Sequence, residues 1–391
     1  MNGIIRRLAS RALSMVSRAL PPHLSSWSRA MGSELAEIPD DRAALAFAVG
    51  CLRATLTLVI AARLRSARDL LFPSAPLAWS STTMNGISAR PRLLGLICGA
   101  GAVASGLAYM LAAGAPSRYL LVNLAALVIG ATAWLVLTRT ARARPAWAGA
   151  AALALALPIL LTALFGVAAD GAWRWVSVGP ISLQVSLIVL PVMIVLYARR
   201  PDAIGTIGMV VAALALAAQP DRAMAGVLLA ALVALLCVAP SRHAITAAVA
   251  ATLAFGWTLL KPDTLPASPF VDQVFYTAFD VHPLAGLAVV IGAVALVMPA
   301  VIGTLRGGGE RPALLAFGGC WFGVVVAAAL DNHPTPLVGY GGSAVLGYLL
   351  SVALLPNGVR GTSGANASGS QPVTDRSTDR SMPELRVAGL I

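Results

Sequence analysis

The stretch LLGLICGAGAVASGLAYMLAA, residues 93–113, consists of apolar and small residues and contains no charged side chain. A helix rises about 1.5 Å per residue, so about 20 such residues cross the ~30 Å hydrocarbon core of a bilayer. The stretch therefore predicts a transmembrane helix, and nine comparable runs follow it. They lie at 119–138, 146–168, 183–198, 203–218, 222–239, 243–260, 284–304, 312–330 and 336–355.

The composition of the whole chain agrees with these runs. Hydrophobic residues make up 58% and charged residues 11% of the 391 residues, with a mean hydropathy of +0.81. Soluble domains carry about twice that share of charge, so we predict an all-α polytopic membrane protein with about ten spans. The runs are rich in Ala and Gly, which favours close helix packing. No P-loop, GxGxxG, HExxH or GxSxG motif is present, so soluble-type nucleotide or hydrolase chemistry has no support.

Two flanking regions differ from this membrane domain of residues 93–355. Residues 1–92 are basic, and MNGIIRRLASRALSMVSRAL at 1–20 spaces arginines as an amphipathic helix at a membrane surface would. An eleventh apolar stretch at 43–65 contains Arg53 near its middle, which favours an interfacial or re-entrant helix over a true span. Residues 356–391 are rich in Gly, Ser and Thr and predict a disordered tail.

Charged residues orient the ten spans. One orientation collects eight basic residues on one side and four on the other, and the positive-inside rule then puts both termini in the cytoplasm. Much of the net charge of +12 therefore lies at cytoplasmic membrane edges and in the tails, where anionic lipid attracts it. It does not indicate binding of nucleic acid. The eight are Arg139, Arg142, Arg144, Arg199, Arg200, Arg242, Arg306 and Arg311, and the four are Arg118, Arg174, Arg222 and Lys261.

The remaining polar chemistry is concentrated in four loops on the non-cytoplasmic side, at 171–184, 219–223, 261–283 and 331–343. The four cysteines are isolated in apolar segments, so neither a disulfide framework nor a zinc site is predicted. His282 and His333 stand near aspartates in these loops, which leaves a divalent cation as an alternative without a defined ligand set.

These loops, in this order, resemble the SEDS family, the FtsW/RodA/SpoVE family of ten-helix peptidoglycan glycosyltransferases. GAWRW at 171–175 is similar to the family's Gly-Ala-x-Arg-Trp motif, and Gln184 and Ser186 fall in register with the motif that follows it. QPD at 219–221 is similar to its Gln-Pro-Asp motif, and PLVGYGGS at 336–343 to its Pro-x-Val-Ser-Tyr-Gly-Gly-Ser motif. The resemblance covers roughly residues 90–355 and implies a SEDS-like bundle.

The loop at 261–283 supplies the catalytic candidate. VDQVFYTAFDVHPLAG at 271–286 aligns with the family segment that carries its proposed catalytic aspartate, which falls on Asp272. A base is needed to take a proton from an attacking sugar hydroxyl. By the same resemblance Arg174 would bind a departing diphosphate. The substrate-binding candidates are Arg174, Trp175, Gln184, Ser186, Gln219, Asp221, Asp280, Tyr340 and Ser343.

The resemblance implies a lipid II polymerase at the outer face of the bacterial inner membrane. Its product would be an undecaprenyl-linked glycan, and its partners a class B penicillin-binding protein and divisome or elongasome proteins. Departures from the family pattern keep other functions open. The outer loop before Asp272 is cut to about a dozen residues after Trp257, and the family's Gln-Pro-Ser-Glu reads QVSL at 184–187. The alternatives are a non-catalytic scaffold that binds lipid II or a division protein, and a flippase for a lipid-linked precursor.

Simpler structural interpretations exist for the same residues. An Arg-Trp pair at a membrane boundary also serves as a snorkelling anchor. Asp221 could cap a helix, and the Gly-Tyr-Gly-Gly run at 339–342 could serve only close packing. Asp272 would be an enzyme's base only if it reached a cleft that also contains Arg174.

Overall fold

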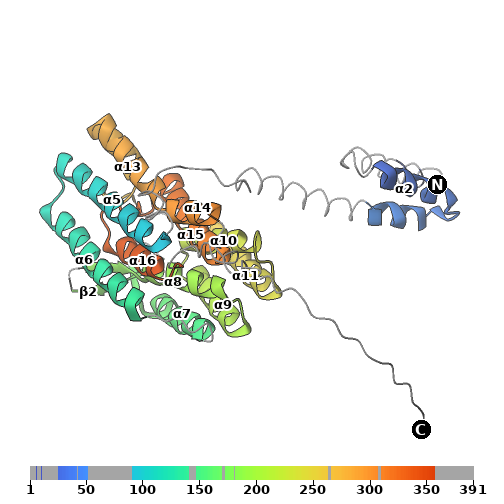
Figure 1. Ribbon diagram of the computed structural model, residues 1–391, viewed down its shortest axis with the longest axis horizontal. Coiled ribbons are helices and arrows are strands. Elements are labelled where there is room, and N and C mark those ends of the chain that lie inside the picture. Colours follow the sequence, from blue (N-terminus) through green and yellow to red (C-terminus); the bar gives the residue numbers. More distant parts are fainter. Residues whose placement is uncertain are drawn as a thin grey trace, which may run out of the picture. The chain divides into compact units, whose positions relative to one another are not determined.

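The computed structural model describes residues 6, 10, 25–41, 43–51, 90–140, 147–169, 172–179, 181–262, 266–306 and 310–356. Helices occupy all ten predicted spans, which confirms the predominantly α-helical membrane fold (Figure 1). They are α5 (Pro91–Ala112), α6 (Ser117–Thr140), α7 (Ala148–Phe165), α8 (Val185–Arg199), α9 (Ala203–Ala218), α10 (Arg222–Leu236), α11 (Arg242–Leu259), α13 (Pro283–Ala295) with α14 (Met298–Leu305), α15 (Arg311–Leu330) and α16 (Gly342–Ala353).

The helices differ in length. Among the described residues, α5, α6, α7 and α15 are long and apolar enough to cross a membrane, and α8, α9, α10 and α16 are shorter apolar helices. The pair α13 and α14 is long and apolar enough only when the two helices are taken together, and they meet at an angle of 47°. Pro299 lies in the first turn of α14, where its missing N–H cannot continue the hydrogen-bond ladder of α13. The bend therefore follows from the sequence at this position.

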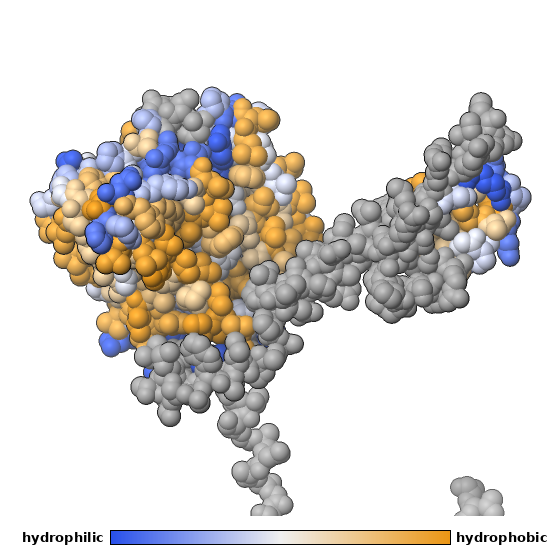
Figure 2. All heavy atoms as spheres, turned by 90° about the horizontal axis from the view of Figure 1, so that it is seen from above, coloured by the Kyte–Doolittle hydropathy of each residue, from blue (hydrophilic) through white to orange (hydrophobic). Residues whose placement is uncertain are grey.

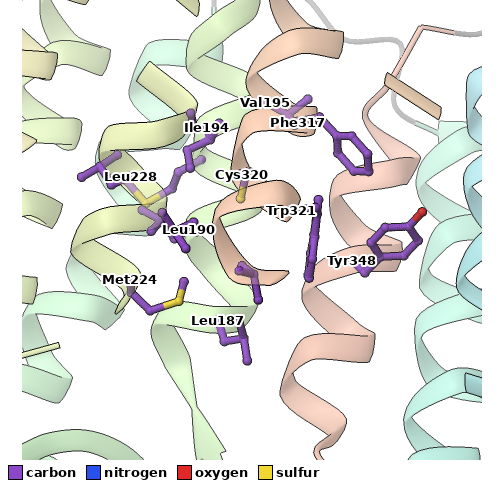
Figure 3. Close-up of a cluster of buried hydrophobic side chains, with 14 of the residues drawn as sticks. Leu187, Leu190, Ile194, Val195, Met224, Leu228, Phe317, Cys320, Trp321 and Tyr348 are labelled. Carbon is purple, nitrogen blue, oxygen red and sulfur yellow. The ribbon is translucent and has the colours of Figure 1, made fainter. Parts of the chain in front are cut away.

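Helix α8 is the centre of the bundle, and it packs against α7, α10, α15 and α16. Its buried side chains include Leu190 and Ile194, which belong to one buried cluster with Leu228 of α10 and Cys320 of α15 (Figure 3). The helix runs from Gln184, its N-cap, to Arg199. This course makes α8 a rigid element that connects the two ends of the bundle.

The outer surface of the bundle suits a bilayer. Large apolar side chains are exposed on the outward faces of several helices, as at Leu121 and Leu253. Figure 2 shows a broad hydrophobic surface on the bundle with hydrophilic residues gathered toward its upper and lower edges. A surface of this kind is what lipid contact requires.

The first polar loop folds as a sheet, which the sequence interpretation did not predict. Strands β1 (Val167–Ala169), β2 (Ala172–Val178) and β3 (Ile181–Gln184) form an antiparallel sheet in the order β1-β2-β3. The β2–β3 register pairs Val178 with Ile181 and Trp175 with Gln184. The turn between them begins with Gly179 at φ +59°, a left-handed conformation that glycine adopts at no steric cost.

The last span begins later than expected. The predicted run starts at residue 336, but α16 starts at Gly342, and residues 336–341 form a loop. Leu337 has φ +61°, which interrupts helical geometry before α16 can begin. A further short helix, α12 (Val274–Val281), precedes α13.

The N-terminal region is described in part. Helix α2 (Ser25–Glu37) buries Met31 and Leu35 in a small cluster with Ala44 and Ala48 of the helical residues 43–51. Apart from Arg6 and Ser10, the predicted surface helix at 1–20 lies outside the described residues. So do the remainder of the 43–65 stretch and the predicted tail beyond residue 356.

Candidate functional site

The segments that precede α8, α12 and α16 meet around one cavity of about 370 Å³. We call this the cavity end of the bundle. Arg174 of β2 and Asp272, in the segment between α11 and α12, both line the cavity. The sequence therefore named two residues that lie 98 positions apart and that the fold brings to one cavity. Other lining residues are Trp175, Gln184, Ser268, His333, Thr335, Tyr340 and Ser343.

Arg174 is buried by the sheet and by the turn before α10. Arg174 is only 2% exposed, and its Nη2 donates a hydrogen bond to the carbonyl oxygen of Pro220 at 2.5 Å. Trp173, its neighbour on β2, is 40% exposed. Strand alternation therefore turns the guanidinium inward and Trp173 outward, so Arg174 is not a surface anchor.

Asp221 is a fully buried carboxylate that caps α10. Its Oδ1 accepts from the backbone N of Met224 at 3.2 Å, which satisfies one of the free N–H groups of the first turn. Its Oδ2 accepts from Gln184 Nε2 and from Ser186 Oγ, both at 3.2 Å. His333 Nε2 lies 3.7 Å from Oδ1. Asp221 thus holds β3, the start of α8 and the segment before α16 together behind the cavity wall.

Gln184 and Ser343 connect α8 to α16 in the same wall. The backbone N of Gln184 donates to Ser343 Oγ at 3.0 Å. Asn123 of α6 makes two hydrogen bonds to the segment before α16. Its Nδ2 donates to the Gly339 carbonyl at 2.8 Å, and its Oδ1 accepts from Gly341 N at 3.0 Å. Tyr340 stacks on Tyr119, with ring centroids 3.9 Å apart. These contacts fix the motif residues of the fourth loop in place.

Asp272 precedes α12 in a tightly turned segment. Its Oδ2 accepts from the backbone N of Ser268 at 2.8 Å, and the residue is 9% exposed. Burial raises the pKa of the Asp272 carboxyl, and the charge of Asp331 adds to this, while the bond from Ser268 opposes it. A carboxyl with a raised pKa is a better proton acceptor once ionised than an ordinary surface aspartate.

Backbone hydrogen bonds join the Asp272 segment to the loop before α16. Thr335 N donates to the Val271 carbonyl at 2.8 Å, and Tyr340 N donates to the Phe270 carbonyl at 2.6 Å. Gln273, which has φ +57°, donates through Nε2 to Asn332 Oδ1 at 2.7 Å. Asp272 is therefore placed by two loops acting as one unit, in spite of the short connection that precedes it.

The predicted site residues fall into three groups. Arg174, Trp175, Gln184, Asp272, Tyr340 and Ser343 line the cavity. Ser186 and Asp221 lie in the buried network behind its wall, and Gln219 donates to the Ile159 carbonyl at 2.7 Å. Asp280 is exposed on α12 and does not line the cavity.

Several polar contributors, among them Asn123 and Thr335, were not singled out as site residues from the sequence. Asn123 is the one amide within the apolar run at 119–138, and that isolation was a usable signal. Thr335 contributes through its backbone, which leaves no signal in the sequence. Within the described residues, no group of three or more His, Cys, Asp or Glu side chains could hold a metal ion.

Comparisons with known proteins give matches to solved structures. No family model and no curated protein matches the chain. Among solved structures, the rod shape determining protein RodA of Thermus thermophilus matches with 19% identity and a TM-score of 0.49, covering 66% of this chain and 94% of that one. An aspartate-to-alanine mutant of the same RodA matches with 19% identity and a TM-score of 0.47 over the same shares. Neither match assigns an activity to this chain.

Proposed function

We propose that this protein is a glycosyltransferase of the SEDS type, which polymerises lipid II into glycan strands at the outer face of the bacterial inner membrane. The single observation that carries the proposal is that Arg174 and Asp272 line the same cavity. An enzyme needs its base and its anion-binding group at one substrate. A scaffold or a flippase does not require this pairing.

Asp272 is the proposed general base. In its ionised form it takes the proton of the 4-hydroxyl of the acceptor sugar while the hydroxyl oxygen attacks the anomeric carbon of the donor. The bond from that carbon to the diphosphate oxygen breaks, and undecaprenyl diphosphate leaves with the electron pair. Burial raises the pKa of Asp272, so the carboxylate gains basicity for this step.

Arg174 is the proposed contact for the leaving diphosphate. A guanidinium is a planar fork that binds phosphate oxygens bidentately, and it stabilises charge that develops during the reaction. The bond to the Pro220 carbonyl and the burial of the residue hold the group in a fixed orientation. An orientation that is set before the ligand arrives reduces the entropy lost on binding.

The activity test is polymerisation of lipid II by the purified full-length protein, alone and together with a class B penicillin-binding protein. We expect glycan chains from the wild type and none from Asp272→Ala. Glu310→Gln is the matched control, because it neutralises a carboxylate that pairs with Arg199 at the opposite end of the bundle. Chain formation by Asp272→Ala would refute the assignment of the base. Lipid II binding without chains in the wild type would favour a scaffold.

A further inference from the structure

His333 lines the same cavity as Arg174, and no role in the reaction described above has been given to it. It precedes Pro334 in the loop between α15 and α16, and it is 9% exposed. Its Nε2 is 3.7 Å from the buried Oδ1 of Asp221. A histidine in this position brings a second group that can carry positive charge to the cavity.

The surroundings of Asp221 indicate why an ionisable partner is useful there. A buried carboxylate is costly unless its oxygens are hydrogen-bonded and its charge is compensated. The Asp221 carboxylate accepts hydrogen bonds from Gln184, Ser186 and the backbone N of Met224. All three donors are neutral. His333 is the side chain paired with Asp221 that becomes cationic, so the two form an ion pair when the imidazole is protonated.

Anchors on both sides hold His333 against Asp221. Asp331, two residues before it, pairs with Arg222 of α10 at 3.3 Å. Thr335, two residues after it, donates its backbone N–H to the carbonyl of Val271, the neighbour of Asp272. The ring is thereby held between the start of α10 and the Asp272 segment, in the wall of the cavity. Its position does not depend on a flexible surface loop.

We propose that His333 is a second cationic contact, beside Arg174, for the phosphate groups of a lipid-linked diphosphate sugar, and that Asp221 is its positioning residue. This inference rests on the proposed function, because it concerns the same ligand and the same cavity. An imidazolium binds the ligand more tightly than a neutral imidazole, so affinity falls as rising pH removes the proton.

Several charged groups lie around His333 and enter any pH dependence. Asp221 lies 3.7 Å from its Nε2 and favours its charged form, whereas Arg174 lines the same cavity and opposes it. Asp331, two residues before His333, and Arg222 pair with each other. Asp272 lines the same cavity and gains negative charge as the pH rises, which also repels an anionic ligand. The test must therefore separate His333 from Asp272, and an Asp272→Asn background does so.

The experiment measures binding of a short-chain prenyl-diphospho-N-acetylglucosamine to the full-length protein in nanodiscs. Both phosphates of this probe are diesters, so its own charge stays constant between about pH 5 and 8. In the Asp272→Asn background we expect affinity to weaken across this range. His333→Gln in that background should bind about tenfold more weakly at the acidic end and show a flat profile.

Two further variants make the result specific. His243→Gln, near the opposite end of the bundle at the start of α11, should keep the profile of the background protein. Asp221→Asn keeps a good helix cap but removes the negative charge, so the binding midpoint should move to lower pH. A merely structural role of Asp221 would lower affinity without moving the midpoint.

The outcomes separate this inference from the proposed function. Binding that requires Arg174 but keeps its pH dependence in His333→Gln would overturn the inference and leave the function standing. An affinity that does not change with pH in the Asp272→Asn background would also overturn the inference and leave the function standing. This measurement does not depend on the folding of a His333 variant. Absence of probe binding under all conditions would overturn both.

Discussion

The two ends of the bundle both contain arginines with little exposure, but these arginines make different contacts. At the cavity end, Arg174 lines a cavity that also contains Asp272. At the opposite end, Arg92 and Arg199 donate to the carbonyls of Leu355 and Leu354, just beyond the end of α16. These carbonyls carry the negative end of the helix dipole, so the two arginines act as C-terminal caps. A buried arginine therefore indicates a ligand site only where a cavity and a second reactive group accompany it.

The largest effect expected from this comparison is on catalysis by Arg174. Arg174→Lys keeps the charge but loses the planar fork, so we expect lipid II polymerisation to fall by about 100-fold. Arg92→Lys at the opposite end should leave the rate per folded molecule unchanged. The measurement is the initial rate of glycan synthesis, normalised to folded protein. Equal losses in both variants would remove the distinction between the two ends.

The next effect is the pH profile of the reaction. Burial raises the pKa of Asp272, and the base must be ionised to act. Polymerisation should therefore fall by about tenfold per pH unit as the pH is lowered below that raised pKa. Initial rates measured over a pH series, with protein stability followed in parallel, check this. A rate that stays constant through the acidic range would rule out Asp272 as the base.

The opposite end should show its effect in stability instead of activity. Arg199→Ala removes the bond to the Leu354 carbonyl and the 3.5 Å ion pair with Glu310, so we expect a loss of about 2 kcal/mol of stability. Glu310→Gln should cost less, because only the partly exposed ion pair is lost. Thermal unfolding in detergent gives both values. An activity loss per folded molecule in Arg199→Ala would show that this end also takes part in the reaction.

The smallest expected effect is a gain in stability when the proposed base is removed. The folded-state pKa of Asp272 lies above its ordinary value of 3.8, so its stabilising contribution is present below that value and is lost as the pH rises through the raised pKa. Asn cannot ionise, and Asp272→Asn should therefore raise the unfolding midpoint at neutral pH by about 1–3 °C. Asp280→Asn on the exposed face of α12 should not change it. A fall in the midpoint of Asp272→Asn would indicate a structural role.

The helices of the ten predicted spans were predictable because each depends on the length of a local apolar run. The sheet of β1, β2 and β3 was not predicted, since the segment that contains Trp173, Arg174 and Trp175 was interpreted as a polar loop between spans. Two helix details were also local but were overlooked: the bend at Pro299 and the left-handed Leu337, which delays α16.

The membership of the site was only partly predictable. Motif positions named Arg174 and Asp272, but their meeting depends on backbone bonds such as Thr335 to Val271, which no side chain reveals. The sequence left two roles open for Asp221, a helix cap and a substrate contact. It caps α10 and also holds Gln184 and Ser186, so the cap is its observed role. Asp280 shares the motif but faces outward, because α12 turns it away from the cavity.

The most direct test of the account measures lipid II affinity and glycan synthesis on the same preparations of wild type, Asp272→Asn and Arg174→Lys. If one cavity holds both the base and the phosphate contact, Asp272→Asn will bind lipid II at least as tightly as wild type and form no chains, whereas Arg174→Lys will lose affinity as well. Glycan synthesis by Asp272→Asn at the wild-type rate would contradict the account.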